Sequence, residues 1–203
     1  QGVDLFVLDP AIGAFLRVER GLRIPAASKN YSLNEGNRPS FPEGYQRYLD
    51  WAQKGGYSAR YAGAMVADVH RILLKGGVFM YPPTKKAPNG KLRLMYEANP
   101  MAMIIENAGG KALASPGQRI LEVQPTDIHQ RTPLILGSPD EVDHVVARLA
   151  EAGLRGPASF AARIPRDATL ISAALPGARA RSARAARRGS PRPCRSCGPR
   201  AAS

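Results

Sequence analysis

The sequence predicts an α/β fold in which helices flank a mixed sheet. Short apolar runs typical of strands alternate along the chain with segments whose apolar residues recur at helical spacing. Clusters of glycine, proline and asparagine separate the two kinds of segment. The first 150 or so residues are also enough to bury a substantial hydrophobic core. We therefore expect one folded α/β unit before about residue 153.

The first third of the chain predicts a strand pair followed by a long loop and a helix. The strands are rich in aliphatic residues and are separated by Asp9-Pro10 and Gly13. The loop is rich in Pro, Ser and Asn, and the helix stops before Gly55-Gly56. The expected elements are strands at Val3–Leu8, Ala14–Val18 and Leu22–Ile24, a loop over 25–40 and a helix from about Glu43 to Gln53.

The middle of the chain predicts a helix, two strands and a second helix. The first helix spans Met65–Leu74, since Met65, Val69, Ile72 and Leu73 share one face. Gly76-Gly77 ends it. The elements expected after it are strands at Val78–Tyr81 and Leu92–Tyr96, and a helix from Asn99-Pro100 to Gly109-Gly110.

The last folded segment predicts three short strands and a well-marked helix. The strands are expected at Ala112–Leu113, Ile120–Val123 and Pro133–Leu136. For the helix, Ser138 is the expected N-cap, Pro139 lies at the first helical position and Glu141 would complete a capping box. Gly153 would end it.

The net charge of +13 is concentrated at the C-terminus. Residues 154–203 contain eleven arginines and one acidic residue, Asp167, which gives +10. Residues 176–203 are mostly Ala, Arg, Pro, Ser and Gly and lack aromatic residues, so we expect a disordered basic tail over 153–203. Arginine could bind nucleic acid through phosphates, but without aromatic residues for base stacking we expect no nucleic-acid partner.

Cysteine content and hydropathy indicate the cellular compartment of the protein. Cys194 and Cys197 are the only cysteines, and a single pair without a second ligand pair is a weak signal for zinc or redox chemistry. A folded part without cysteine fits a reducing compartment, so we expect a cytoplasmic protein. No run approaches the ~20 apolar residues that cross a bilayer, so we expect no membrane partner.

The segment between Tyr81 and Tyr96 gathers positive charge. Lys85, Lys86, Lys91 and Arg93 lie in it without an acidic residue. Ammonium, guanidinium and phenol groups are what an oxyanion such as phosphate needs. The alternative is a solvated hairpin turned at Asn89-Gly90, in which lysines only maintain solubility. Residue spacing alone leaves both interpretations open.

Glu97 is a lone carboxylate directly after this positive segment. Such a residue is often only salt-bridged, because magnesium prefers several hard oxygens in octahedral array. Asp4, Asp9 and Asp68 do not lie where they could join it: the first two flank a strand and the third is on a helix. The three histidines are not at ligand spacing from another such group, and no Ser or Cys nucleophile with a base is evident.

Three motifs resemble the class 1 fructose-1,6-bisphosphatase family, within the inositol-phosphatase-like sugar phosphatases. They are ARYAGAMVADVHRILLKGG, GKLRLMYEANPMA and PTDIHQRTPLILGSPDEV, in the family's order, and the resemblance covers about residues 2–150. It implies the C-terminal half of a layered sugar-phosphatase fold, in residues 1–152. The implied activity is metal-dependent hydrolysis of the 1-phosphate of fructose 1,6-bisphosphate, giving fructose 6-phosphate, in gluconeogenesis.

The resemblance also implies roles for individual residues. Tyr81, Lys86, Lys91 and Asn34 would contact the sugar phosphate, with Tyr61 and Met65 lining the sugar pocket. Arg60 would reach a neighbouring subunit's 6-phosphate, which implies a homo-oligomer, a tetramer in this family. Arg93 would lie near the 1-phosphate and the metals, and Glu97 would be one ligand of Mg²⁺ (or Mn²⁺ or Zn²⁺).

The family's other metal ligands belong to an Asp-Pro-x-Asp-Gly-type motif that is not in this sequence. We therefore expect the chain to be a fragment that turns over negligibly alone. The tail has the composition of GC-rich DNA read out of frame, so we interpret it as a frameshift or readthrough product. The alternatives are a sedoheptulose-1,7-bisphosphatase, which shares the central motif, or a non-catalytic module that binds sugar phosphates or polyanions.

Overall fold

The computed structural model describes residues 2–154 and 156. The predictions about the tail beyond these residues, including the Cys194–Cys197 pair, lie outside the described residues. Within them, no helix is long and apolar enough to span a membrane.

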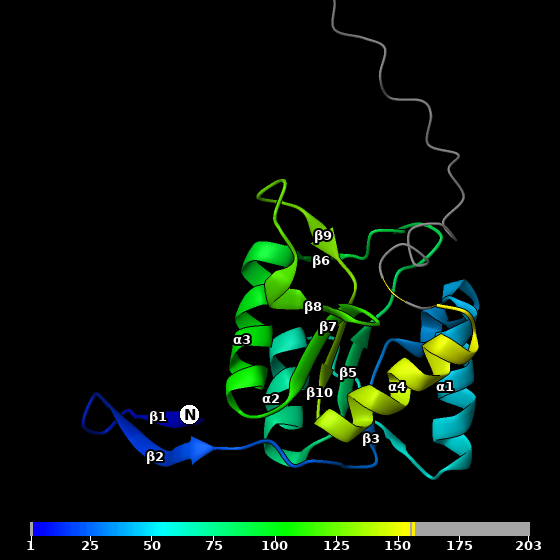
Figure 1. Cartoon of the computed structure of the whole chain (residues 1–203). Helices are drawn as coiled ribbons and strands as arrows, with labels where there is room; N and C mark the ends of the chain where they lie inside the picture. Colours follow the sequence, from blue (N-terminus) through cyan, green and yellow to red (C-terminus); the bar gives the residue numbers. More distant parts are fainter. Residues whose placement is uncertain (1, 155, 157–203) are drawn as a thin grey trace, which may run out of the picture. The chain divides into compact units, whose positions relative to one another are not determined.

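A six-stranded mixed sheet organises the described part of the chain (Figure 1). Its central strands β3, β5 and β10 pair in that order, with β3 parallel to β4 and β5, and β10 antiparallel to β5 and β7. The α/β prediction is thus confirmed. In spatial order the strands are β4 (Ser58–Ala59), β3 (Asn30–Ser32), β5 (Val78–Tyr81), β10 (Leu134–Gly137), β7 (Lys111–Ser115) and β8 (Gln118–Arg119).

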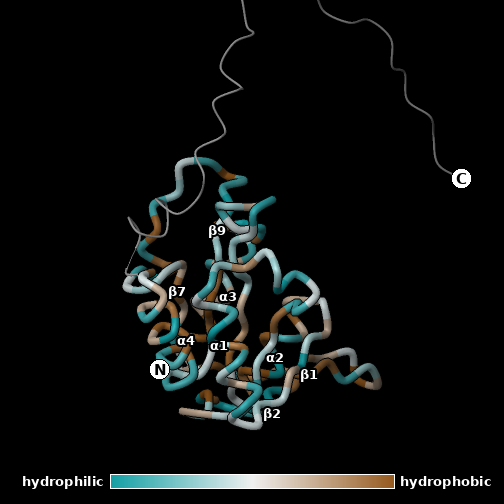
Figure 2. Tube along the Cα trace, turned by 90° about the vertical axis from the view of Figure 1, so that its right-hand side faces the viewer, coloured by the Kyte–Doolittle hydropathy of each residue, from teal (hydrophilic) through white to brown (hydrophobic). Residues whose placement is uncertain are grey.

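Helices cover both faces of this sheet, as Figure 1 shows. On one face, α2 (Met65–Lys75) and α3 (Asn99–Asn107) pack on Phe79, Leu134 and Leu136. On the other, α1 (Glu43–Lys54) and α4 (Pro139–Glu151) pack on Val78, Met80 and Ile135. Adjacent residues of β5 and β10 point to opposite faces, so each strand serves two hydrophobic clusters. Figure 2 shows how hydrophobic and hydrophilic segments alternate along the chain.

Trp51 lies where α1 meets α4. Its ring centroid is 4.8 Å from that of His144 and 5.1 Å from that of Tyr57. The Arg148 guanidinium stands 5.0 Å from the Trp51 ring centroid, a cation–π distance. The two helices are therefore joined by an aromatic and cationic cluster as well as by aliphatic packing.

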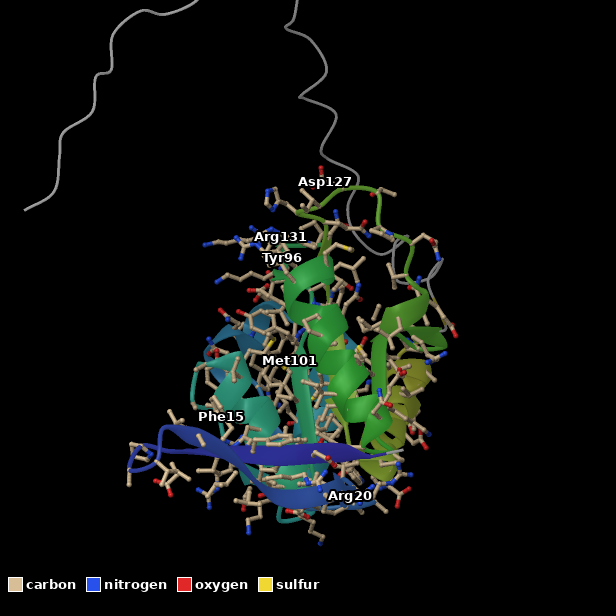
Figure 3. The ribbon with its side chains drawn as sticks, turned by 90° about the vertical axis from the view of Figure 1, so that its left-hand side faces the viewer. Phe15, Arg20, Tyr96, Met101, Asp127 and Arg131 are labelled. Atoms are coloured by element: carbon tan, nitrogen blue, oxygen red, sulfur yellow. The ribbon has the colours of Figure 1, made fainter. Side chains whose placement is uncertain are left out.

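The predicted strand pair forms a separate antiparallel hairpin of β1 (Val3–Asp9) and β2 (Ala14–Leu22). Leu8 pairs with Phe15, and Val7 with Leu16. Large apolar side chains are exposed on both faces of this ribbon, Phe15 most of all at 70% (labelled in Figure 3). The hairpin therefore exposes a group of large apolar side chains, a feature that commonly marks an interaction surface.

Some predicted boundaries are wrong. The strand predicted at Leu92–Tyr96 is only β6 (Leu92–Arg93), which pairs with β9 (Arg131–Thr132). Leu94–Ala98 is instead a π-helical turn that continues into α3. The strand expected at Ile120–Val123 is a 3₁₀ turn, Ile120–Glu122. The expected loop over 25–40 contains β3 and a 3₁₀ helix, Glu35–Ser40, while β2 ends at Leu22 and does not reach Ile24.

The predicted capping box of α4 is also wrong, because both side chains have partners far along the chain. Ser138 is the N-cap residue, but its hydroxyl accepts a hydrogen bond from the Gly77 N–H at 3.0 Å. The buried Glu141 carboxylate accepts from the Ser28 N–H at 3.0 Å. These two contacts attach the start of α4 to the segments that precede β5 and β3.

Candidate functional site

The residues proposed to bind a sugar phosphate follow the carboxyl ends of three parallel strands. Tyr31 of β3 pairs with Ala59 of β4 and with Val78 of β5, so the three strands end at one edge of the sheet. In α/β folds this edge is where ligands commonly bind. Asn34 follows β3, Arg60 and Tyr61 follow β4, and Tyr81 is the last residue of β5.

Tyr61, Tyr81 and Asn34 interact at this edge although they are distant in sequence. Burial raises the pKa of Tyr61, with smaller contributions in the same direction from Tyr81 and Asp68, and a hydrogen bond with the Asn34 side chain acts in the opposite direction. The Asn34 carboxamide also accepts from the Gly36 N–H at 3.2 Å, which orients it. A protonated phenol and an amide next to each other are hydrogen-bond donors suited to phosphate oxygens.

The lysine loop after β5 supplies positive charge beside these groups. Lys85, Lys86 and Lys91 are exposed, and within residues 2–154 and 156 their ammonium groups make no salt bridge or side-chain hydrogen bond. The hairpin interpretation of this loop is wrong, because β5 pairs with β3 and β10 whereas β6 pairs with β9. The loop instead lies against the segment around Thr132, which the Gly90 backbone approaches closely.

Met65 and Arg60 differ in their surroundings. Met65, the first residue of α2, is half-buried and packs against the core cluster of that face. Arg60 is exposed, and its backbone N–H donates to the Tyr31 carbonyl at 2.8 Å. In the described part of the chain its guanidinium has no partner, so it is free to meet an anion.

Glu97 lies in the π-helical turn Leu94–Ala98, not at a strand end. Its carboxylate accepts from the Arg93 N–H at 2.6 Å and lies 3.6 Å from the Arg93 guanidinium. Arg93 also stands 5.7 Å from the ring centroid of Tyr96. This turn therefore holds its one carboxylate beside a guanidinium.

Tyr96 connects this turn to the segment before β9. Its hydroxyl lies 2.8 Å from Nδ1 of His129, and the two rings meet edge to face. Arg131 donates to the Lys91 carbonyl, and Figure 3 shows Tyr96 and Arg131 at the same end of the molecule. His129 thus has a well-defined tyrosine partner, which residue spacing did not predict.

The buried carboxylate of Asp68 forms an ion pair with the partly exposed Arg71 close to Tyr61. Asp68 is fully buried, and both of its oxygens accept from the Ala62 N–H, at 3.0 and 3.2 Å. Arg71 donates to Asp68 at 2.9 Å and also to the Arg60 carbonyl. Residue spacing placed Asp68 on a helix without a role, although the i,i+3 pairing of opposite charges was a usable signal.

The chain matches known proteins in both sequence and structure. The family profile described as "Fructose-1-6-bisphosphatase, C-terminal domain" matches residues 24–150. The chain belongs to the fructose-1,6-bisphosphatase family. It is 54% identical over 154 residues to the class 1 fructose-1,6-bisphosphatase of Synechococcus elongatus, and 53% identical over 152 residues to isozyme 2 of Rattus norvegicus.

Solved structures of this family have the same fold. The crystal structure of Leishmania major fructose-1,6-bisphosphatase in holo form matches 72% of this chain with a TM-score of 0.70 and 49% identity. The match covers 46% of that chain, as it covers 44% of the Synechococcus and rat proteins. The described fold is thus a family fold that spans less than half of its relatives' length.

Family membership implies a divalent metal, and the described residues do not form a complete site for one. Among residues 2–154 and 156, no three His, Cys, Asp or Glu side chains gather where they could hold a metal ion. Glu97 stands without a second carboxylate and is paired with Arg93. Magnesium needs more oxygen ligands than this turn offers. The described residues therefore supply at most one ligand.

Proposed function

We propose that this chain forms the sugar-phosphate side of an enzyme that hydrolyses the 1-phosphate of fructose 1,6-bisphosphate. The products are fructose 6-phosphate and phosphate, and the pathway is gluconeogenesis. The relatives carry the name of this reaction, and the chain matches 44% of the length of several of them. Catalytic turnover requires the whole enzyme, whereas the carboxyl ends of β3, β4 and β5 bind the substrate.

One observation carries the proposal. Three strand ends bring Asn34, Tyr61 and Tyr81 together, and the loop that directly follows Tyr81 carries lysines without partners in the described part of the chain. An unpaired ammonium group in a solvated loop is available for a phosphate, with no internal salt bridge to break. If the lysines only kept the loop soluble, the hydrogen-bond donors Tyr61, Tyr81 and Asn34 would not need to lie together where the loop begins.

Each side chain contributes a distinct contact. Tyr81 and Asn34 donate hydrogen bonds to the 6-phosphate, and Lys86 neutralises its charge. Lys91 lies along the sugar, which rests on Tyr61 and Met65. Arg93 faces the 1-phosphate. Holding the substrate at both ends uses binding energy to orient the reacting phosphate.

The assembled enzyme requires groups that the described residues lack. We assign Glu97 as one ligand of its metal, Mg²⁺, with Mn²⁺ and Zn²⁺ as alternatives. We assign Arg60 to the 6-phosphate of a neighbouring subunit, since its guanidinium is exposed and unpaired in the described part of the chain. The enzyme would then be a homo-oligomer, a tetramer, in the cytoplasm.

Calorimetric titration of the full 203-residue chain with fructose 6-phosphate tests the proposal. Binding is expected, and Lys91→Ala should weaken it about tenfold because a charge-assisted hydrogen bond is lost. Lys111→Ala is the matched control: Lys111 is paired with Asp143 on α4 and begins β7 at the opposite edge of the sheet. Equal affinity in Lys91→Ala and the parent chain would overturn the assignment. Tighter binding of sedoheptulose 7-phosphate would favour the alternative substrate.

A further inference from the structure

The segment Arg60–Ala62 carries two of the proposed ligand contacts but has little packing of its own. Residues 60 to 64 are all exposed, although Tyr61 only to 40%, so little apolar burial holds them in place. Ordering exposed backbone costs conformational entropy that hydrogen bonds must offset. The segment's conformation therefore depends on the polar contacts that it makes.

Those contacts come from two sides. On the sheet side, the Arg60 N–H donates to the Tyr31 carbonyl of β3 at 2.8 Å. On the helix side, the Arg60 carbonyl accepts from Nη2 of Arg71, and the Ala62 N–H donates to the Asp68 carboxylate. Tyr61 lies between these two attachment points.

Asp68 and Arg71 form one unit. Nη2 of Arg71 donates both to Asp68, at 2.9 Å, and to the Arg60 carbonyl. Asp68 is fully buried, a location where a carboxylate is costly unless paired and hydrogen-bonded. It lies in the first turn of α2, where negative charge is favourable, and the N-cap residue Ala64 makes no side-chain cap.

We propose that Asp68 and Arg71 are positioning residues, which hold the Arg60–Ala62 backbone so that Tyr61 meets Tyr81 and Asn34. This inference rests on the proposed function, because it assigns the pair a role in the same site. Neither residue touches the sugar phosphate. Each acts through Tyr61, and their loss is expected to weaken ligand binding without removing a ligand contact.

Arg71→Lys is the principal test. Lysine keeps the charge but lacks the guanidinium fork, so it cannot donate to Asp68 and the Arg60 carbonyl with the same geometry. Fructose 6-phosphate affinity in the full chain should fall about fivefold to tenfold, the effect of one misplaced hydrogen-bonding group. Asp143→Asn, which breaks the Lys111–Asp143 ion pair at the opposite edge of the sheet, should leave affinity unchanged.

A double-mutant cycle distinguishes positioning from general loosening. If Arg71 acts through the Tyr61 side chain, Tyr61→Ala combined with Arg71→Lys should bind no more weakly than Tyr61→Ala alone. Arg71→Lys combined with Lys91→Ala should instead weaken fructose 6-phosphate binding by the product of the two single-variant factors. Losses of affinity that multiply when Arg71→Lys is combined with Tyr61→Ala would overturn the proposal.

Amide hydrogen exchange at Ala62 adds a readout that needs no ligand. Exchange should be faster in Arg71→Lys and Asp68→Asn than in Asp143→Asn, because the carboxylate that accepts from this N–H is displaced or neutralised. Unchanged exchange would overturn the proposal even if Asp68→Asn proves too unstable to purify. If the parent chain does not bind fructose 6-phosphate, the proposed function fails; if it binds and Arg71→Lys binds equally well, the positioning role alone fails.

Discussion

The backbone N–H of Arg93 donates to the Glu97 carboxylate at 2.6 Å, and the Arg93 guanidinium lies 3.6 Å from its other oxygen. One side chain thus closes the π-helical turn that links β6 to α3. The ion pair is partly exposed, at 39% for Arg93 and 29% for Glu97, so its Coulombic contribution is small. The hydrogen bond to the backbone is the stronger structural constraint.

Glu97→Gln should therefore change the free energy of unfolding by less than about 1 kcal/mol, since the amide oxygen still accepts from Arg93. Glu97→Ala removes this acceptor and should cost about 1–2 kcal/mol more. Urea unfolding of both variants measures the difference. Equal destabilisation by the two substitutions would show that the charge, and not the acceptor, holds the turn.

The full chain alone should release negligible phosphate from fructose 1,6-bisphosphate, and Mg²⁺ should not raise its melting temperature. A ligand stabilises a protein only as far as it binds the folded state, and the described residues offer one carboxylate in place of a metal centre. A phosphate-release assay and a thermal scan with and without Mg²⁺ measure both. Turnover near the rates of intact relatives would contradict this prediction.

Gly90→Ala should destabilise the chain by more than about 2 kcal/mol. Gly90 has φ of +80°, and a Cβ there would lie 2.2 Å from the Thr132 carbonyl carbon. Gly117→Ala is the matched control: φ is +78°, but nothing lies within 4 Å of the added Cβ, so about 1 kcal/mol is expected. Chemical denaturation gives the free energy of unfolding of both variants and so separates steric conflict from backbone strain. Similar losses of unfolding free energy in the two variants would refute the close approach of the lysine loop to Thr132.

Alkaline pH should destabilise the fold, in part through Tyr31. Burial, and then its hydrogen bond to Glu35, raise the pKa of Tyr31 from 10.0 to about 12. Because this pKa is raised in the folded state, the protonated Tyr31 phenol contributes fully to the free energy of unfolding below about pH 10. This contribution is lost as pH rises towards 12. Tyr31→Phe should therefore flatten the decline in unfolding free energy between pH 9 and 11, as measured by urea titration. An unaltered slope would mean that other tyrosines dominate.

The exposed hairpin should make the full chain self-associate. Phe15→Ser lowers the exposed apolar area and should shift sedimentation towards the monomer without lowering the melting temperature, because Phe15 is 70% exposed. Ser40→Ala, a small change in the 3₁₀ helix Glu35–Ser40, serves as a control with no expected effect on association. A fall in melting temperature with Phe15→Ser would show that this side chain is packed in solution.

Periodicity predicted the long elements well. The apolar stripes of α2 and α4 are confirmed, because the residues that make the pattern are the ones that become buried, such as Val69 and Val145. β5 and β10 were also located, since continuous apolar runs are typical of strands covered on both faces. The resemblance placed the family, and the parallel register of β3, β4 and β5 then brought Asn34, Tyr61 and Tyr81 to one edge.

The features that the sequence did not predict depend on specific hydrogen bonds, most of them between distant segments. β3 and β4 are only three and two residues long: β3 forms because it pairs with β5, and β4 because it pairs with β3. Leu92–Tyr96 alternates like a strand, yet Glu97 bonds back to Arg93 and closes a helical turn. Ser138 matches an N-cap motif, but its hydroxyl accepts a hydrogen bond from the Gly77 N–H. In each case a specific hydrogen bond, local in the turn that Glu97 closes and between distant segments in the other two, overrides the local pattern.

The aromatic cluster at the junction of α1 and α4 gives the chain a built-in optical probe. Trp51 is the only tryptophan in the sequence, and it contacts both Tyr57 and His144. Its emission consequently reports how these two helices pack against each other. Fluorescence can follow chemical denaturation of that layer without any label, whereas ligand binding at the phosphate edge calls for a separate signal.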